Sequence, residues 1–232
     1  MAVPTDSDET FLREVDENLR RDQLRDWARK YGWWLVGALV LFLAAVGGWL
    51  YWQERQRAEA AEDSEILSQI YTDIGTGQMA TVPKRLDVLA DDGKGAVRAT
   101  ALFTGAAVAL EQNDRTTATA KYNAIANDDN LAAPYRDLGL IRATSLEFDT
   151  LKPEQVIARM EPLAKPGNPW FGTAGELTAM AMIKQGKKSE AGRLFATIAA
   201  DRQVPPSIRA RAVQIAGSLG VDASASISAI DQ

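Results

Sequence analysis

The sequence predicts an all-α protein in which a single N-terminal transmembrane helix precedes a helical-repeat solenoid. Residues 33–52 form an uninterrupted apolar stretch bounded by aromatic residues. Beyond it, apolar residues recur at helical intervals as far as Leu219, in segments separated by short runs of Gly, Pro, Asn and Asp. The sequence lacks the sustained apolar–polar alternation of a half-buried strand. Both observations therefore favour helices throughout.

The apolar stretch has the length of one bilayer crossing. As an α-helix, its 20 residues span about 30 Å, the thickness of the hydrocarbon core. Aromatic rings prefer the headgroup level. They cluster at both ends of the stretch, with Trp27, Tyr31, Trp33 and Trp34 at one end and Trp49, Tyr51 and Trp52 at the other. We assign residues 31–53 to a transmembrane helix that contacts the lipid bilayer through Trp33–Trp52.

A buried core helix and a cleaved signal peptide are the alternatives to this assignment. A core helix usually carries a polar stripe, whereas no polar side chain interrupts residues 35–50. Signal peptides have a shorter apolar region, and small residues at the cleavage site follow it closely. Here about thirty residues precede the apolar stretch, and charged side chains separate it from the small residues at 58–60. We expect an uncleaved anchor.

Positive charges near the two ends of the stretch predict its orientation. Residues 13–32 contain six Arg and Lys, whereas residues 53–72 contain two. Because cytoplasmic flanks carry the excess of positive charge, we expect the N-terminus in the cytoplasm.

The other segments follow from this topology. Residues 1–8 are small and polar, and we expect them to be disordered. Residues 9–30 predict a cytoplasmic amphipathic helix, which either sets the topology or contacts the membrane surface or a partner. Residues 54–220 are expected to form the translocated helical domain, and residues 221–232 a flexible tail.

Composition argues against several functional classes. The 232-residue chain carries 26 basic and 31 acidic residues, a net charge of −5, so nucleic acid is not expected as a partner. The sequence contains no Cys, which excludes a disulfide framework and a thiolate site, and no His, the commonest general base and metal ligand. Carboxylate pairs such as Asp91-Asp92 lie in predicted turns, without a calcium loop or a phosphate-binding loop. We expect no enzymatic activity, no cofactor, no metal site and no small-molecule substrate.

A pattern of about 36 residues repeats in the helical domain. A residue of small or medium size is followed four positions later by a large one and three positions after that by an aliphatic one. The four copies are Val82, Leu86 and Leu89; Ala118, Tyr122 and Ile125; Val156, Met160 and Leu163; and Ala191, Phe195 and Ile198. This spacing is typical of the second helix of a two-helix repeat, whose neighbours must stack. An irregular helical bundle is the alternative.

The first helices of the repeats are predicted at residues 99–110, 135–148 and 172–183, and a last helix at 207–219. Ala106, Thr144 and Ala179 are their predicted close-contact positions. Side chains three before, one after and four after these positions are expected on the concave face: Phe103, Ala107, Leu110, Ile141, Ser145, Phe148, Glu176, Met180 and Ile183.

An apolar stripe of this kind suits an extended or helical segment of a protein partner. Trp170, after a proline-bounded turn, is a further candidate anchor. The candidate partner-binding residues are therefore Phe103, Leu110, Ile141, Phe148, Met180, Ile183 and Trp170. The alternative is that residues 64–74 or the last helix cover this surface.

One family combines these features. The run FLREVDENLRRDQLRDWARKYGWWLVGALVLFLAAVGGWLYWQ, followed by degenerate two-helix repeats, resembles the ancillary subunit of the bacterial SecYEG translocon, of the alphaproteobacterial type. The repeats lack the Trp, Leu-Gly and Tyr of the full tetratricopeptide signature.

This resemblance implies a single-pass protein of the bacterial inner membrane with a periplasmic tetratricopeptide-like domain. It implies a scaffold or adaptor in protein export, whose partners are Sec translocon subunits and a membrane-anchored periplasmic chaperone of the parvulin-like type. The alternative function is an adaptor that regulates envelope biogenesis or cell division through the peptidoglycan-synthesis machinery.

Overall fold

The computed structural model describes the backbone of residues 6–223, and the side chains from Lys30 onward except at 31–32, 35, 56 and 58–60. In this described range the regular elements are all helices. The predicted all-α class is confirmed. The chain divides into two compact units, Met1–Glu62 and Asp63–Gln232.

Helix α1 extends from Asp6 to Gly75 and contributes to both units. Within it, Val36–Arg55 is long and apolar enough to cross a membrane, and none of that segment is buried. Trp33, Leu41 and Phe42 are 80%, 73% and 65% exposed. A core helix of a soluble domain buries such side chains against its own chain, so these exposures argue against that alternative.

The predicted N-terminal segments fall mainly on residues that are not described. Residues 1–5, which make up most of the segment expected to be disordered, lie outside the described range, and α1 begins at Asp6. Residues 9–30 belong to α1, but the side chains that would define an amphipathic face lie almost entirely outside the description. The orientation across a membrane stays a prediction.

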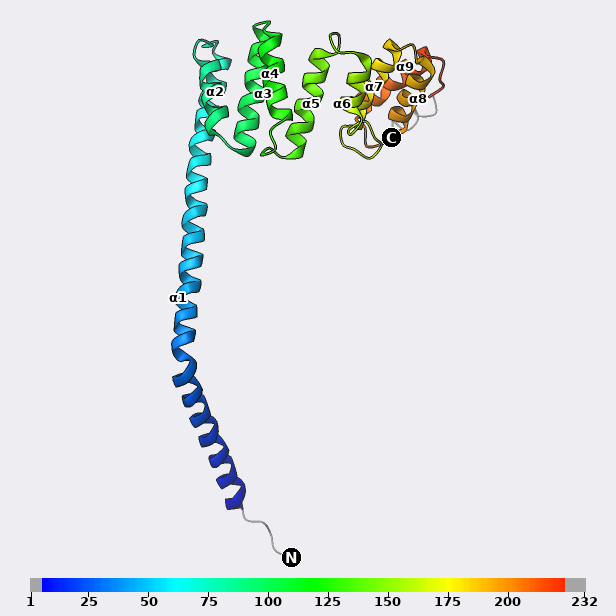
Figure 1. Cartoon of the computed structure of the whole chain (residues 1–232). Helices are drawn as coiled ribbons and strands as arrows, with labels where there is room; N and C mark the ends of the chain where they lie inside the picture. The colour runs from blue at the N-terminus through cyan, green and yellow to red at the C-terminus, as the bar shows by residue number, and fades with distance from the viewer. Residues whose placement is uncertain (1–5, 224–232) are drawn as a thin grey trace, which may run out of the picture. The chain divides into compact units, whose positions relative to one another are not determined.

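The second unit consists of helix pairs in series (Figure 1). The pairs are the end of α1 with α2 (Val82–Asp92), α3 (Gly95–Glu111) with α4 (Arg115–Ala126), α5 (Ala133–Glu147) with α6 (Pro153–Met160), and α7 (Phe171–Lys184) with α8 (Lys188–Ala200). Helix α9 (Pro206–Ser218) follows α8 and packs against it. This arrangement is the predicted helical-repeat solenoid.

The predicted repeat positions form the core. All twelve residues of the second-helix pattern are at most 7% exposed, and the three close-contact residues of the first helices are fully buried. Small side chains at Ala106 and Ala179 let neighbouring helices approach, and large ones such as Phe195 fill the space between them. Leu163 is buried although it lies beyond the end of the short helix α6.

The turns within two repeats show the internal alignment directly. Gly186, between α7 and α8, has a φ of 80°, a conformation that side chains with a Cβ rarely adopt. At the corresponding turn between α3 and α4, Asn113 has a φ of 59°. After Gly, Asn is among the residues that best tolerate a positive φ. Both repeats therefore place a residue suited to the left-handed conformation at the same position of the turn.

The joint between α5 and α6 is looser than the others. Helix α5 packs extensively against α4, and α6 against α7, whereas α5 and α6 share few contacts. Two ion pairs connect the parts: Arg159 Nη1 lies 2.6 Å from Glu147 Oε2, and Lys184 Nζ lies 2.9 Å from Asp149 Oδ1. Helix α5 therefore meets α7 at a point where close packing within the α5–α6 repeat is interrupted.

The packed domain extends past the predicted boundary at residue 220. Ala223 is 8% exposed within the core of α7, α8 and α9. A Cβ on Gly192 would lie 2.7 Å from Cγ2 of Val221, so the glycine provides the room in which Val221 lies against α8. Residues 221–223 thus lie against the helical domain, residues 224–232 lie outside the description, and the flexible tail stays a prediction.

Candidate functional site

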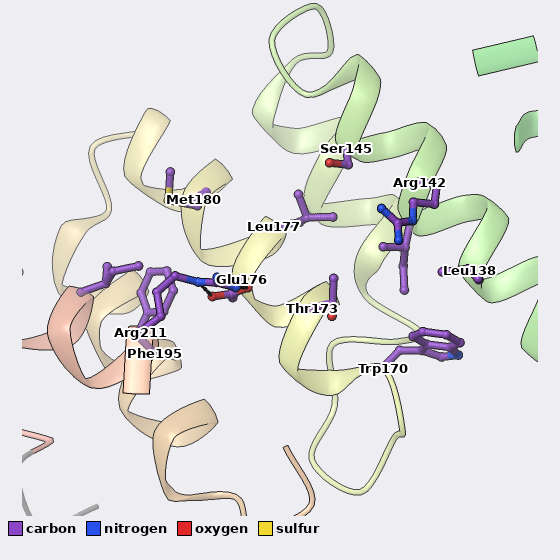
Figure 2. A pocket seen from close by; sticks show the side chains of 12 residues that line it. Leu138, Arg142, Ser145, Trp170, Thr173, Glu176, Leu177, Met180, Phe195 and Arg211 are labelled. Carbon is purple, nitrogen blue, oxygen red and sulfur yellow. Dashed lines mark hydrogen bonds and ion pairs between the residues drawn. The ribbon is translucent and has the colours of Figure 1, made fainter. Parts of the chain in front are cut away.

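The candidate site is an open groove of about 490 Å³ between α5, α7 and α9. This size falls within the range of about 300–1,000 Å³ found for ligand pockets. Figure 2 shows its side chains entering from facing helices. The groove is lined by Leu138, Ile141, Arg142 and Ser145 of α5; by Trp170 with Thr173, Glu176, Leu177 and Met180 of α7; and by Phe195, Arg211 and Ile215.

Helical spacing explains why α7 contributes one wall. Thr173, Glu176 and Met180 are three and four residues apart, so they follow one face of the helix. Ala179, on another face of α7, is fully buried in the core. Helix α7 therefore packs with one face and leaves the other toward the groove.

Apolar side chains make up most of the groove surface. Met180 is 42% exposed, an unusual fraction for a large apolar side chain in a packed domain. Trp170 precedes the first residue of α7, and its backbone N–H donates a hydrogen bond to Asn168 Oδ1 at 2.8 Å. This bond fixes the turn after Pro169, which positions the indole at the groove beside Leu138 (Figure 2).

Arg211 and Glu176 form an ion pair in the groove, in which their opposite charges compensate each other. Arg211 Nε donates to Glu176 Oε1 at 2.7 Å, and Arg211 Nη2 donates to Glu176 Oε2 at 2.6 Å. The hydrogen bonds that Arg211 donates to Glu176, and the negative charge of that carboxylate, raise the pKa of Arg211. This two-pronged geometry ties α9 to α7 and uses both carboxylate oxygens of Glu176.

A second arginine in the groove has no such partner. Arg142 of α5 is exposed, and within the described part of the chain it makes no ion pair or hydrogen bond. The groove therefore combines an apolar surface with one uncompensated positive charge.

Residues 25–215 match the family model of the tetratricopeptide repeat-like domain. The chain belongs to this family. It is also similar to the ancillary SecYEG translocon subunit of Haemophilus influenzae, with 26% identity over 109 residues, 47% of this chain and 53% of the relative. The chain thus spans about half the length of the curated relative that it matches. No solved structure matches the chain significantly.

In this tetratricopeptide repeat-like domain, three of the seven candidate partner-binding residues meet in one groove. Ile141, Met180 and Trp170 line it, together with the predicted concave residues Ser145 and Glu176. Ile141 is only 3% exposed and forms part of the floor, whereas Met180 is accessible.

The other four candidates lie elsewhere. Phe103 lines a separate hollow of about 360 Å³ with Tyr71 and Ile74 from the end of α1. Phe148 lies under the ammonium of Lys184, which is 4.3 Å from the ring centroid. The remaining two pack, partly buried, against the core: Leu110 and Ile183.

Flanking helices border the predicted surface without closing it. Tyr71 of α1 forms a hydrogen bond of 3.2 Å with Thr104 Oγ1 of α3, so residues 64–74 cover part of the α3 face, as the alternative expected. Helix α9 contributes Arg211 and Ile215 to the groove but leaves it open. The covered and the open parts of the surface therefore both exist, in different repeats.

Sequence reasoning missed Leu138, Arg142, Thr173 and Leu177. Leu138 and Thr173 lie three residues before Ile141 and Glu176, so the same stripes extended by one turn toward the N-terminus would have included them. The contribution of α9 had no comparable local signal, because it depends on how the last helix packs.

Proposed function

We propose that this protein is a membrane-anchored, non-catalytic adaptor that holds a protein partner in the α5–α7–α9 groove. The observation that carries the proposal is an open, mainly apolar groove of about 490 Å³ in which Met180 is 42% exposed. Exposed apolar surface of this kind marks interaction sites in repeat domains and elsewhere.

Similarity to an ancillary translocon subunit supports a place for this adaptor at the protein-export channel. We infer that its partners are Sec translocon subunits and a membrane-anchored periplasmic chaperone of the parvulin-like type. The anchor in α1 would confine both proteins to one membrane plane and raise their effective concentration. A weak contact in the groove is then sufficient for a stable association.

The groove chemistry supports binding rather than catalysis. Its carboxylate, Glu176, accepts two hydrogen bonds from Arg211 and thereby ties α7 to α9, which is a structural use of the group.

The proposed location is the bacterial inner membrane, with the N-terminus in the cytoplasm and residues 54–223 in the periplasm. The excess of Arg and Lys before the apolar segment supports this orientation. Protease added to spheroplasts should digest the repeat domain and leave a membrane-protected fragment that contains residues 36–55. Survival of the repeat domain in intact spheroplasts, followed by digestion after lysis, would reverse the orientation.

Site-specific photo-cross-linking tests the partner. A photoreactive amino acid replaces Met180, and in a matched control it replaces Val88 of α2, which is 53% exposed and lies outside the groove. In intact membranes, Met180 should capture translocon or chaperone proteins that Val88 does not. Equal capture from both positions argues against the groove, and capture of peptidoglycan synthases from Met180 replaces the export role with a role in envelope biogenesis.

A charged substitution provides the complementary loss-of-function test. Met180→Asp places a carboxylate on the exposed part of the groove and should abolish capture while the domain stays folded. Phe103 and Leu110 are unsuitable for this purpose because both pack against the core, so a charge there would unfold the domain.

A further inference from the structure

We propose that the α5–α7–α9 groove selects an acidic, apolar segment of a protein, whose carboxylate meets Arg142 and whose neighbouring large apolar side chain contacts Trp170 and Leu138. This inference rests on the proposed adaptor function and specifies the chemistry of the partner.

The first argument is the unequal state of the two arginines in the groove. Arg211 is saturated by Glu176 through two hydrogen bonds, whereas Arg142 is exposed and has no partner among the described residues. Arg142, Leu138 and Trp170 lie on the same side of the groove, away from the Glu176–Arg211 pair (Figure 2). A guanidinium presents a planar set of donors that matches a carboxylate, so Arg142 is suited to bind the side chain of Asp or Glu.

The second argument is the distribution of charge along the solenoid. Residues 133–223, which build the groove, contain 12 basic and 9 acidic residues, a net charge of +3. Residues 63–132 contain 6 basic and 10 acidic residues, a net charge of −4. The half that holds the groove is therefore positive within an acidic chain. Such a local field attracts an acidic segment and disfavours a basic one.

The third argument is that charge alone does not match the groove. Its surface around Arg142 is formed by Leu138, Leu177 and the ring of Trp170, which gain free energy when apolar side chains cover them. A purely acidic segment would leave this apolar surface in contact with water. A purely apolar segment would remove water from Arg142 without providing a counter-ion, which costs free energy. A segment with both features satisfies both requirements.

Fluorescence anisotropy of labelled peptides tests this selectivity on the full chain in lipid nanodiscs. The probe is a short fluorescein-labelled peptide with a Leu-Glu-Leu centre between Ser and Gly residues, and its two counterparts carry Gln or Lys in place of Glu. Wild-type protein should bind the Glu peptide about tenfold more tightly than the Gln peptide, because a charge-assisted hydrogen bond is stronger than a neutral one. The Lys peptide should bind most weakly.

Substitutions of Arg142 then test whether this residue causes the preference for Glu. Arg142→Gln should remove the preference for Glu over Gln, and Arg142→Glu should reverse it in favour of Lys. The matched control is Arg193→Gln on α8, an exposed arginine outside the groove that donates to Ser189 Oγ, and it should keep the wild-type preference. A reversed preference in Arg142→Glu cannot result from unfolding, because unfolding would weaken the binding of all three peptides alike.

Three results would overturn the inference. The first is a preference for Glu that persists in Arg142→Gln. The second is tighter peptide binding after deletion of residues 224–232, which would make the chain's own end the occupant. The third is an affinity for the Glu peptide that falls as more protein molecules are placed in each nanodisc, because a second copy of the protein would then occupy the groove. Cross-linking from Met180 is measured independently, so a partner captured there would uphold the adaptor function even if the acidic selectivity fails.

Discussion

A close contact between successive repeats yields a prediction about one glycine. Gly139 lies in α5 where this helix crosses α4. A Cβ at this position would lie 2.9 Å from Ile125 Cγ2 and 3.0 Å from the backbone carbonyl oxygen of Tyr122. The carbonyl oxygen belongs to a helix backbone and cannot move aside as a flexible side chain can. We therefore predict that Gly139→Ala destabilises the domain.

The magnitude follows from two opposing effects. Replacement of Gly by Ala inside a helix stabilises by about 1 kcal/mol. Overpacking a close contact costs about 1–3 kcal/mol. Because the steric cost exceeds the gain in helix propensity, Gly139→Ala should lower the free energy of unfolding by about 1 kcal/mol.

Gly217 is the matched control. It lies in α9, and a Cβ there would have no atom within 4 Å. Gly217→Ala should therefore gain up to about 1 kcal/mol from helix propensity alone. The same chemical change thus has opposite signs at the two positions, and the difference between the variants is about 2 kcal/mol.

Thermal unfolding of the full chain in nanodiscs, followed by far-UV circular dichroism, measures this difference. For a domain of this size, 1 kcal/mol corresponds to about 2–4 °C in Tm, so the two variants should differ by about 4–8 °C. The close-packing argument is refuted if Gly139→Ala raises Tm as much as Gly217→Ala does.

Three further predictions concern the groove and the helix termini. Phe195→Ala should lower the free energy of unfolding by about 3–5 kcal/mol, because this ring is fully buried in the core that also forms the groove wall. Met180→Ala removes an exposed side chain and should change Tm little. Comparable losses of Tm in the two variants would contradict the assignment of core and groove. Glu176→Gln should tighten binding of the Leu-Glu-Leu peptide, because it leaves Arg211 as a second uncompensated cation; weaker binding in the anisotropy assay would show that Glu176 positions Arg211 for another purpose. Asp114 accepts hydrogen bonds from the Oγ1 and N–H of Thr117 at 2.6 and 2.9 Å, which lower its pKa in the folded state. Its stabilising effect is complete above the unfolded aspartate pKa of about 3.9 and is lost as the pH falls through the lower folded-state pKa. The Tm difference between wild type and Asp114→Ala should therefore shrink on acidification below that value, and a constant difference in pH-dependent melting would contradict the role of the carboxylate.

The sequence by itself determined the helices, the repeat and the apolar segment. These features depend on residues near one another in the chain: three and four residues apart on a helix face, or in a continuous apolar run. The buried pattern from Val82 to Ile198 was predictable because each repeat helix must pack one face, whatever its exact neighbours are.

The groove depended on tertiary structure. Arg211 reaches Glu176 from 35 residues away, and this pairing decides that Arg142 is the cation left unpaired among the groove residues that the structure describes. Whether a residue on the first helices is covered also depends on distant elements, since the end of α1 contacts the α3 face and the loose joint after α5 leaves the next face open. Periodicity identifies which side chains share a face, but only the packing of remote helices determines which of these faces remain accessible.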